Sequence, residues 1–131
     1  HLARGKTPVR ERIDLLLEAD GRPPCYVEVK NVTMRRDLSA DGPAEFPDAV
    51  TARGAKHLDE LAAMAANGCR AVMLFLVQRT DCRRFAVAAD IDPAYAAGLA
   101  RARAAGVEAL CYGCRLSPAE IVVDRPIPLA F

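Results

Sequence analysis

Hydrophobic and polar residues alternate along two neighbouring segments near the start of the chain. In residues 10–18 the apolar side chains of Leu15 and Leu17 fall on one face of an extended backbone, and residues 25–32 alternate in the same way. The turn-forming sequence Asp-Gly-Arg-Pro-Pro lies between them at residues 20–24. The pattern therefore predicts two antiparallel strands joined as a hairpin.

The rest of the chain predicts strands that alternate with helices. Residues 48–67 carry apolar residues at helical spacing and end in Asn-Gly, and a second helix that ends at Gly106 begins at an Asp-Pro cap. Between the helices, residues 70–78 form an apolar run typical of a strand buried on both faces. Final strands are expected at residues 107–112 and 120–123. This order predicts parallel crossovers and a mixed central sheet with flanking helices, an α/β or α+β fold.

The connection between the hairpin and the first helix is long. Residues 33–47 are rich in charged residues, Gly and Pro, and predict a loop of about fifteen residues, where about 4–6 is usual. Loops of that length are usually functional or mobile. Arg35 and Arg36 in this loop, and Arg79 after the buried strand, are candidate contacts for DNA phosphates. Charges that only keep loops solvated explain these arginines equally well.

Composition limits the class of protein. The 131 residues carry 18 Lys and Arg against 17 Asp and Glu, and 52% are hydrophobic, which is typical of one globular domain over residues 1–131. The net charge of +1 argues against binding of nucleic acid by bulk charge, so any such contact must be local. The apolar runs are too short to span a bilayer, and the five cysteines are expected to be reduced thiols. We therefore expect a cytoplasmic protein with no membrane partner.

The predicted hairpin brings charged residues together. Glu28 and Lys30 are two residues apart on one strand, so they share a face at a rise of roughly 6.6 Å. In an antiparallel hairpin, the residue numbers of each directly opposed pair add up to the same sum. Asp14 lies on the face of Glu28 and Lys30 when that sum is even. A turn centred on Gly21 gives a sum of 42 and sets Asp14 opposite Glu28, with Cβ atoms about 5 Å apart. A two-residue turn at Asp20-Gly21 gives 41 and puts Asp14 on the wrong face.

Two carboxylates at that distance repel each other unless a cation lies between them. Mg²⁺, or Mn²⁺ in its place, is the natural partner, because Mg²⁺ takes one or two carboxylates, keeps several waters and uses substrate phosphate for the rest. The expected ligands are Asp14, Glu28 and the Val29 carbonyl, and Lys30 is expected to position the attacking water. The predicted chemistry is phosphodiester hydrolysis. The competing interpretation is an ordinary solvated strand face in which Asp14 is a salt-bridge partner.

Longer runs of the chain resemble a known family. Arg12-Ile13-Asp14, residues 24–33 (PCYVEVKNVT), residues 46–58 (FPDAVTARGAKHL) and residues 75–79 (FLVQR) look like the bacterial sugar fermentation stimulation protein family. The resemblance implies a DNA-binding protein with an N-terminal OB-like domain and a C-terminal domain that resembles the PD-(D/E)XK nucleases, a restriction-endonuclease-like fold. This chain is then expected to be the C-terminal domain, with the OB-like domain absent from it.

By this resemblance, Asp14 and Glu28 match the two carboxylates of the nuclease motif and Lys30 matches its lysine. The hairpin register with an even sum brings the same three residues to one face. The resemblance implies DNA as the partner, and it does not establish cleavage. The alternative function is therefore a regulator of sugar metabolism that binds DNA on a nuclease scaffold without catalysis. The formation of a homo-oligomer is left open.

Nuclease sites of this kind often draw a basic or amide residue from the helix that follows the Glu-x-Lys strand. Lys56 is the expected catalytic residue from that helix, and Arg53 and His57 beside it are expected to contact DNA. All three are predicted to lie off the apolar stripe of the helix, so a solvated helix flank explains them equally well.

Overall fold

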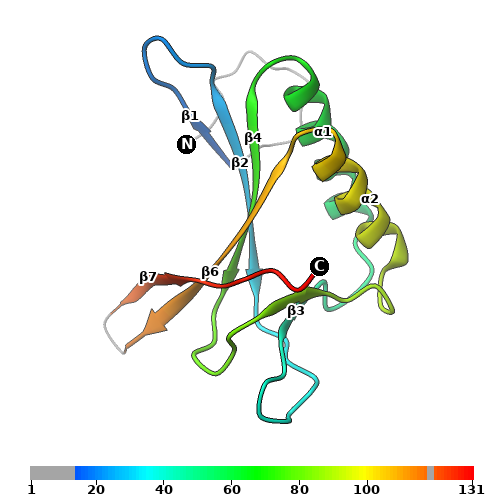
Figure 1. Ribbon diagram of the computed structural model, residues 1–131, viewed down its shortest axis with the longest axis vertical. Helices are drawn as coiled ribbons and strands as arrows, with labels where there is room; N and C mark the ends of the chain where they lie inside the picture. The colour runs from blue at the N-terminus through cyan, green and yellow to red at the C-terminus, as the bar shows by residue number, and fades with distance from the viewer. Residues whose placement is uncertain (1–13, 118–119) are drawn as a thin grey trace.

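The fold is built around a five-stranded sheet (Figure 1). The computed structural model describes residues 14–117 and 120–131. The order of the strands in this sheet is β1-β2-β4-β6-β7. Their bounds are β1 (Leu15–Leu17), β2 (Cys25–Val32), β4 (Arg70–Val77), β6 (Glu108–Leu116) and β7 (Ile121–Pro126). A second sheet pairs β3 (Ala44–Phe46) with β5 (Phe85–Val87), and the helices are α1 (Ala52–Ala66) and α2 (Pro93–Ala104).

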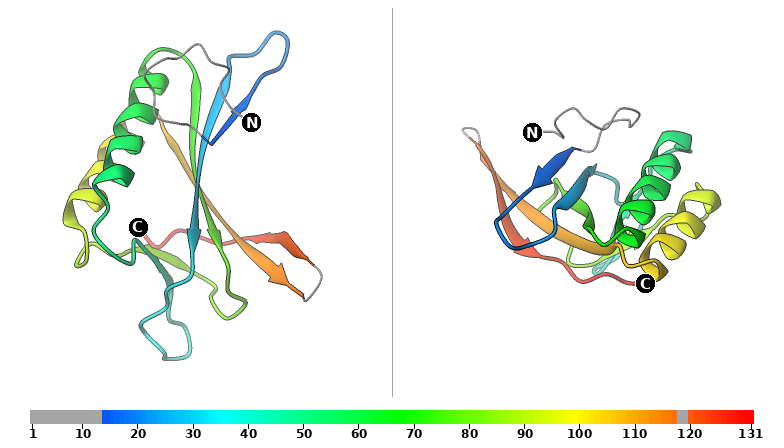
Figure 2. Two further views of the ribbon diagram at one scale, coloured as in Figure 1. Left: turned by 180° about the vertical axis from the view of Figure 1, so that it is seen from behind. Right: turned by 90° about the horizontal axis from the view of Figure 1, so that it is seen from above.

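The three central strands β2, β4 and β6 are parallel, and the edge strands β1 and β7 run antiparallel to their neighbours. Helix α1 connects β2 to β4 and helix α2 lies on the connection from β4 to β6. Both helices lie side by side on one face of the twisted sheet (Figure 2). The prediction of a mixed α/β fold with flanking helices is confirmed. Within the described residues, neither helix is long and apolar enough to cross a membrane.

Helix caps and strand alternation explain where these elements form. The Thr51 side chain accepts a hydrogen bond from the Gly54 N–H, so α1 begins after residue 51 and not at residue 48 as predicted. Asp92 caps α2 in the same way, with Pro93 in the first turn, as the Asp-Pro pattern predicted. Residues paired in register on β2 and β4 point to the same face of the sheet, and Phe75 of β4 belongs to the core on the side of the helices. Its partner on β2 is even-numbered, so the even-numbered residues of β2 face the helices.

The core fills the space between the sheet and the helices. Aromatic rings dominate it: Phe75 lies 4.5 Å from Phe85 between ring centroids, and Phe46 lies 5.4 Å from Tyr95. A smaller cluster lies on the opposite face of the sheet and consists of Cys25, Val27 and Val72. All five cysteines are free thiols.

Two short strands depart from the sequence prediction. Residues 33–47 are not one loop, because β3 lies within them and pairs in parallel with β5. Three-residue strands carry too few positions to show a period, so alternation does not reveal them. The last two strands, β6 and β7, also extend beyond the predicted ranges 107–112 and 120–123, and residues 10–13 of the first predicted strand lie outside the described residues.

The packing of α1 leads to a prediction about Gly54. A Cβ atom at this residue would lie 2.9 Å from the Thr51 side chain and 3.2 Å from Tyr95 Cε1. We expect Gly54→Ala to lower the free energy of unfolding in urea by about 1–3 kcal/mol, despite the helix propensity of Ala. In the matched control Gly98→Ala the nearest atom, Leu58 Cδ1, lies at 3.5 Å, an ordinary contact. The control should be neutral or stabilising by up to about 1 kcal/mol, and equal losses in both variants would contradict the close packing.

Candidate functional site

Asp14 lies directly before β1, at the open end of the hairpin. Leu15 pairs with Val27 and Leu17 with Cys25, so opposed residues sum to 42, as a turn centred on Gly21 predicts. This register continues to Asp14 opposite Glu28. The Asp14 carboxylate is exposed, and its Oδ2 accepts a hydrogen bond of 2.8 Å from the Val29 N–H. Asp14 is therefore fixed to the strand that carries Glu28 and Lys30.

The backbone N–H and carbonyl of Val29 point toward the β1 edge of the sheet, where Asp14 lies. The carbonyls of Pro24 and Val32 accept hydrogen bonds from the N–H groups of Arg70 and Gln78, at the two ends of β4. Because the N–H and C=O of one residue point to the same side of a strand and this side alternates, even-numbered residues of β2 bond to β4. Val29 is odd, so its carbonyl points toward β1, the edge at which Asp14 lies.

Glu28 is buried between β2 and α1 and is 2% exposed. Its Oε2 lies 3.1 Å from Lys30 Nζ and 2.8 Å from His57 Nδ1. Its Oε1 is buried and has no hydrogen-bond partner in the part of the chain that the structure describes. The competing interpretation of a solvated strand face is therefore wrong for Glu28.

The contact of His57 with Glu28 is short, but its angle is not that of a hydrogen bond. The separation of 2.8 Å is that of a hydrogen bond, yet neither ring nitrogen forms an aligned hydrogen bond with any described residue. A bare Nδ1 lone pair would repel a carboxylate oxygen at this distance, whereas a proton on Nδ1 would make the contact attractive. We treat the contact as an electrostatic pair and not as a well-formed hydrogen bond.

Residues of the core surround Glu28 on the side of α2. Met73 is its neighbour on β4, and the hydroxyl of Tyr95 donates a hydrogen bond of 3.9 Å to Met73 Sδ. Burial, and then the negative charge of Glu28, raise the pKa of the Tyr95 phenol. Asp92 accepts hydrogen bonds from the backbone N–H groups of Thr51 and Tyr95, which lower the pKa of the Asp92 carboxyl. This cap ties the first turns of α1 and α2 together beside the site.

The structure brings His57, and not Lys56, into contact with Glu28. His57 is 5% exposed, and this burial argues against the predicted direct contact with DNA. The helical spacing carried a signal that the prediction missed, because position 57 is three residues after Gly54 and four before Leu61 on the buried stripe. Lys56 and Arg53 are exposed on α1, and their roles in catalysis and DNA binding stay predictions.

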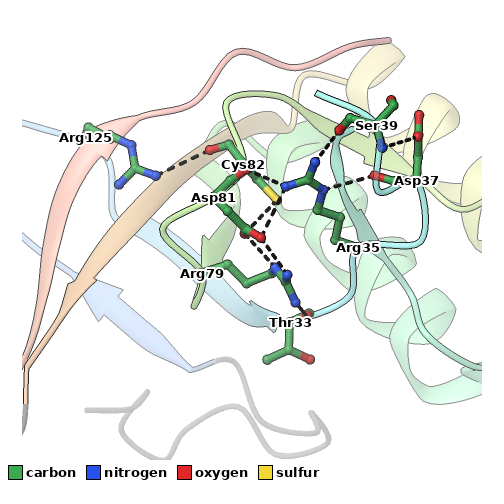
Figure 3. A network of polar contacts seen from close by, with 8 residues as sticks. All are labelled: Thr33, Arg35, Asp37, Ser39, Arg79, Asp81, Cys82 and Arg125. Atoms are coloured by element: carbon green, nitrogen blue, oxygen red, sulfur yellow. Dashed lines mark hydrogen bonds and ion pairs between the residues drawn. The ribbon is translucent and has the colours of Figure 1, made fainter. Parts of the chain in front are cut away.

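Arg35 and Arg79 hold the loop after β2 in place (Figure 3). The Arg35 side chain is 10% exposed, and its guanidinium donates to the carbonyls of Asp37, Ser39 and Asp81. Arg79 binds both carboxylate oxygens of Asp81, at 2.8 and 2.7 Å, and this pairing lowers the pKa of Asp81. These contacts fasten the predicted loop to the connection between β4 and β5. The two arginines therefore have structural partners, and their predicted contacts with DNA stay untested.

Arg36 ties β3 to the segment before α2. It donates to both carboxylate oxygens of Glu45, at 2.8 and 3.0 Å, and to both of Asp90, at 2.7 and 2.9 Å. The hydrogen bonds from Arg36 lower the pKa of the Asp90 carboxyl to about 2. Two carboxylates thus surround this guanidinium, and its predicted role in DNA binding also stays a prediction.

The arrangement has few possible cation ligands. Asp14 supplies an exposed carboxylate, Glu28 a buried one and Val29 a carbonyl at the β1 edge. Among residues 14–117 and 120–131, no group of three or more His, Cys, Asp or Glu side chains lies close enough together to hold a metal ion. A cation bound here would therefore take the rest of its ligands from water or from phosphate oxygens, as Mg²⁺ commonly does.

The mixed sheet and its two crossover helices define an α/β domain with a nuclease-like fold. A family model, described as the sugar fermentation stimulation protein RE domain, matches residues 1–120. The chain belongs to the sugar fermentation stimulation protein family.

Individual relatives agree with this assignment. The sugar fermentation stimulation protein homolog of Rhodospirillum rubrum is 59% identical over 133 residues, which cover 95% of this chain and 53% of the relative. The homolog of Rhodospirillum centenum is 62% identical over 119 residues, which cover 91% of this chain and 50% of the relative. The solved structure of Pyrococcus furiosus SfsA in complex with Ca²⁺ has a TM-score of 0.84 at 27% identity, over 99% of this chain and 55% of that one. The chain thus spans about half the length of these relatives.

The arginine contacts lead to a prediction about stability. Arg35→Ala removes three hydrogen bonds from a charged donor, so we expect the free energy of unfolding to fall by about 2 kcal/mol. The exposed Arg83 is the control, and Arg83→Ala should stay within about 0.5 kcal/mol of wild type. Urea denaturation checks both values. An Arg35→Ala protein as stable as wild type would contradict the structural role of this side chain.

Proposed function

We propose that this chain is a DNA-binding domain with a site for Mg²⁺ or Mn²⁺ that hydrolyses phosphodiester bonds. The observation that carries the proposal is the buried Glu28 carboxylate. Its Oε2 meets Lys30 and His57, whereas its Oε1 has no hydrogen-bond partner among the described residues. A buried oxygen with negative charge and no partner is costly, and a cation at Oε1 would remove that cost.

The donor atoms fit a hard divalent cation. The carboxylates of Asp14 and Glu28 and the carbonyl of Val29 are oxygen ligands, which Mg²⁺ and Ca²⁺ both prefer. The family relative from Pyrococcus furiosus was solved in complex with Ca²⁺. In this chain, Asp14, Glu28 and Val29 are the residues that would hold the ion.

The proposed mechanism divides the work among the side chains. When bound, the cation supplies a water of lowered pKa and neutralises charge on the phosphate. Lys30, whose Nζ lies 3.1 Å from Glu28, would orient the attacking water and stabilise the negative charge that develops on the phosphate oxygens. Arg53 and Lys56, both exposed on α1, would bind the DNA backbone, since phosphate contacts set the position of a duplex on a protein.

A second candidate function is a regulator that binds DNA on the same scaffold without cutting it. It is favoured by the small number of ligands, because the described part of the chain offers no cluster of three acidic, His or Cys side chains. Such a protein would bind DNA with the same affinity in the presence and absence of Mg²⁺. It would release no cleavage product at any metal concentration.

Cation binding is the first prediction of this proposal. Titration calorimetry with Mn²⁺ should show saturable binding to the wild-type chain and at least about tenfold weaker binding to Asp14→Ala, because one of two carboxylate ligands is lost. Asp59→Ala, which removes an exposed carboxylate from α1, is the matched control and should bind Mn²⁺ like wild type. Equal binding by Asp14→Ala and wild type would exclude the proposed site.

Cleavage is the second prediction. Short duplex and single-stranded DNA should be cut in the presence of Mg²⁺ or Mn²⁺, and Lys30→Ala should cut at least about a hundredfold more slowly while it still binds Mn²⁺. Gel analysis of end-labelled DNA measures the rates. If Lys30→Ala cut as fast as wild type, the mechanism would be wrong. If wild type bound Mn²⁺ and DNA but released no product, the regulator would be the better conclusion.

A further inference from the structure

We infer that His57 is a positioning residue that fixes the Glu28 carboxylate so that Oε1 faces the proposed cation. This inference rests on the proposed function, because it assigns a role within the same site. Neither the sequence pattern nor the family resemblance gave His57 this role. The placement of His57 and the division of contacts between the two oxygens of Glu28 support this role.

The nitrogens of Lys30 and His57 both contact the same oxygen of Glu28. Lys30 Nζ lies 3.1 Å and His57 Nδ1 lies 2.8 Å from Oε2 of Glu28, whereas Oε1 is buried without a hydrogen-bond partner in the described chain. Because a carboxylate is planar, attraction of Oε2 by two donors fixes the direction of Oε1. The side chain is thereby held in one orientation before any ligand arrives.

His57 is the more rigid of the two side chains that contact Oε2. Lys30 is a long side chain that is 19% exposed, and a lysine carries many rotamers. His57 is 5% exposed on α1, between Gly54 and Leu61 of the buried stripe. The start of α1 is itself fastened to α2 by the Asp92 cap. The imidazole therefore holds Glu28 against a fixed helix, which the ammonium group alone cannot do.

His57 positions Glu28 and is not itself a ligand of the proposed cation. Within the described residues, no third acidic, His or Cys side chain completes a metal-binding cluster with Glu28 and His57. The ring nitrogen that faces Glu28 is occupied by its contact with Oε2 at 2.8 Å, and it does not face the proposed cation at Oε1. Partners that orient a ligand carboxylate typically contribute a factor of about 10–100 in metal affinity.

Variants at position 57 test the inference by Mn²⁺ calorimetry on the 131-residue chain. His57→Leu should weaken Mn²⁺ binding by about 10–100-fold, because Glu28 loses its polar contact with α1. His57→Asn, whose amide N–H lies near the position of Nδ1, should retain most of the affinity. Leu58→Val, a buried change one residue along α1, is the control for loosened packing, and it should lower the melting temperature without changing Mn²⁺ affinity.

The outcomes separate this inference from the proposed function. If His57→Leu binds Mn²⁺ like wild type while Asp14→Ala does not, His57 is not a positioning residue and the proposed cation site stands. Equal losses in His57→Leu and His57→Asn, or in His57→Leu and Leu58→Val, also overturn the inference. If wild type binds no Mn²⁺, the proposed site fails and the inference fails with it.

A measurement on the cation-free protein checks the contact itself. Nitrogen-15 NMR of the ring should find a proton on Nδ1 of His57, since this atom lies 2.8 Å from the carboxylate. A neutral ring with its proton on Nε2 alone would overturn the inference, whatever the protein does with Mn²⁺.

Discussion

The burial of one negative charge, on Glu28, is the constraint on which the site depends. In-register pairing of β2 with β4 sets Glu28 beside Met73, in the layer where the sheet meets the helices. A carboxylate in such surroundings needs positive or protonated partners. Lys30 supplies one from the same face of the strand, and His57 supplies another from α1. The crossover helix thus packs the core and also completes the electrostatic environment of a residue on the preceding strand.

The hairpin is the part of the site that the sequence predicts well. Strand residues alternate between two faces, so the position of Gly21 at the centre of the turn decides whether Asp14 and Glu28 meet. Gly21 has a positive φ of 77°, a conformation that glycine adopts without strain, and the observed register agrees with a turn centred on it. A local turn and a two-residue period reduced the pairing of residues 14 positions apart to two alternatives, and the structure has the one in which opposed residues sum to 42.

The contacts of the remaining site residues depend on long-range packing that a local pattern does not contain. Residue type suggested Lys56 for the site, whereas helical spacing from Gly54 to Leu61 turns His57 toward the sheet. The arginines were assigned to phosphates by their charge alone, and some of the groups that bind them come from distant segments: Arg36 pairs with Asp90, 54 positions away, and Arg35 donates to the Asp81 carbonyl, 46 positions away. The strands β3 and β5 were also missed, because three-residue strands show no period and their pairing joins segments far apart in the sequence.

The position of Glu28 also bears on the choice between catalysis and DNA binding alone. Phosphate contacts are made by exposed cations, and a buried carboxylate contributes nothing to them. Buried ion pairs are often no more stabilising than apolar residues of the same volume, and a buried oxygen without a partner costs about 1–3 kcal/mol. A scaffold that only displayed arginines to DNA would be at least as stable with an apolar residue at position 28. The unpartnered Oε1 beside Lys30 and His57 therefore supports a role that uses the carboxylate itself, and cation binding is the role that its chemistry favours.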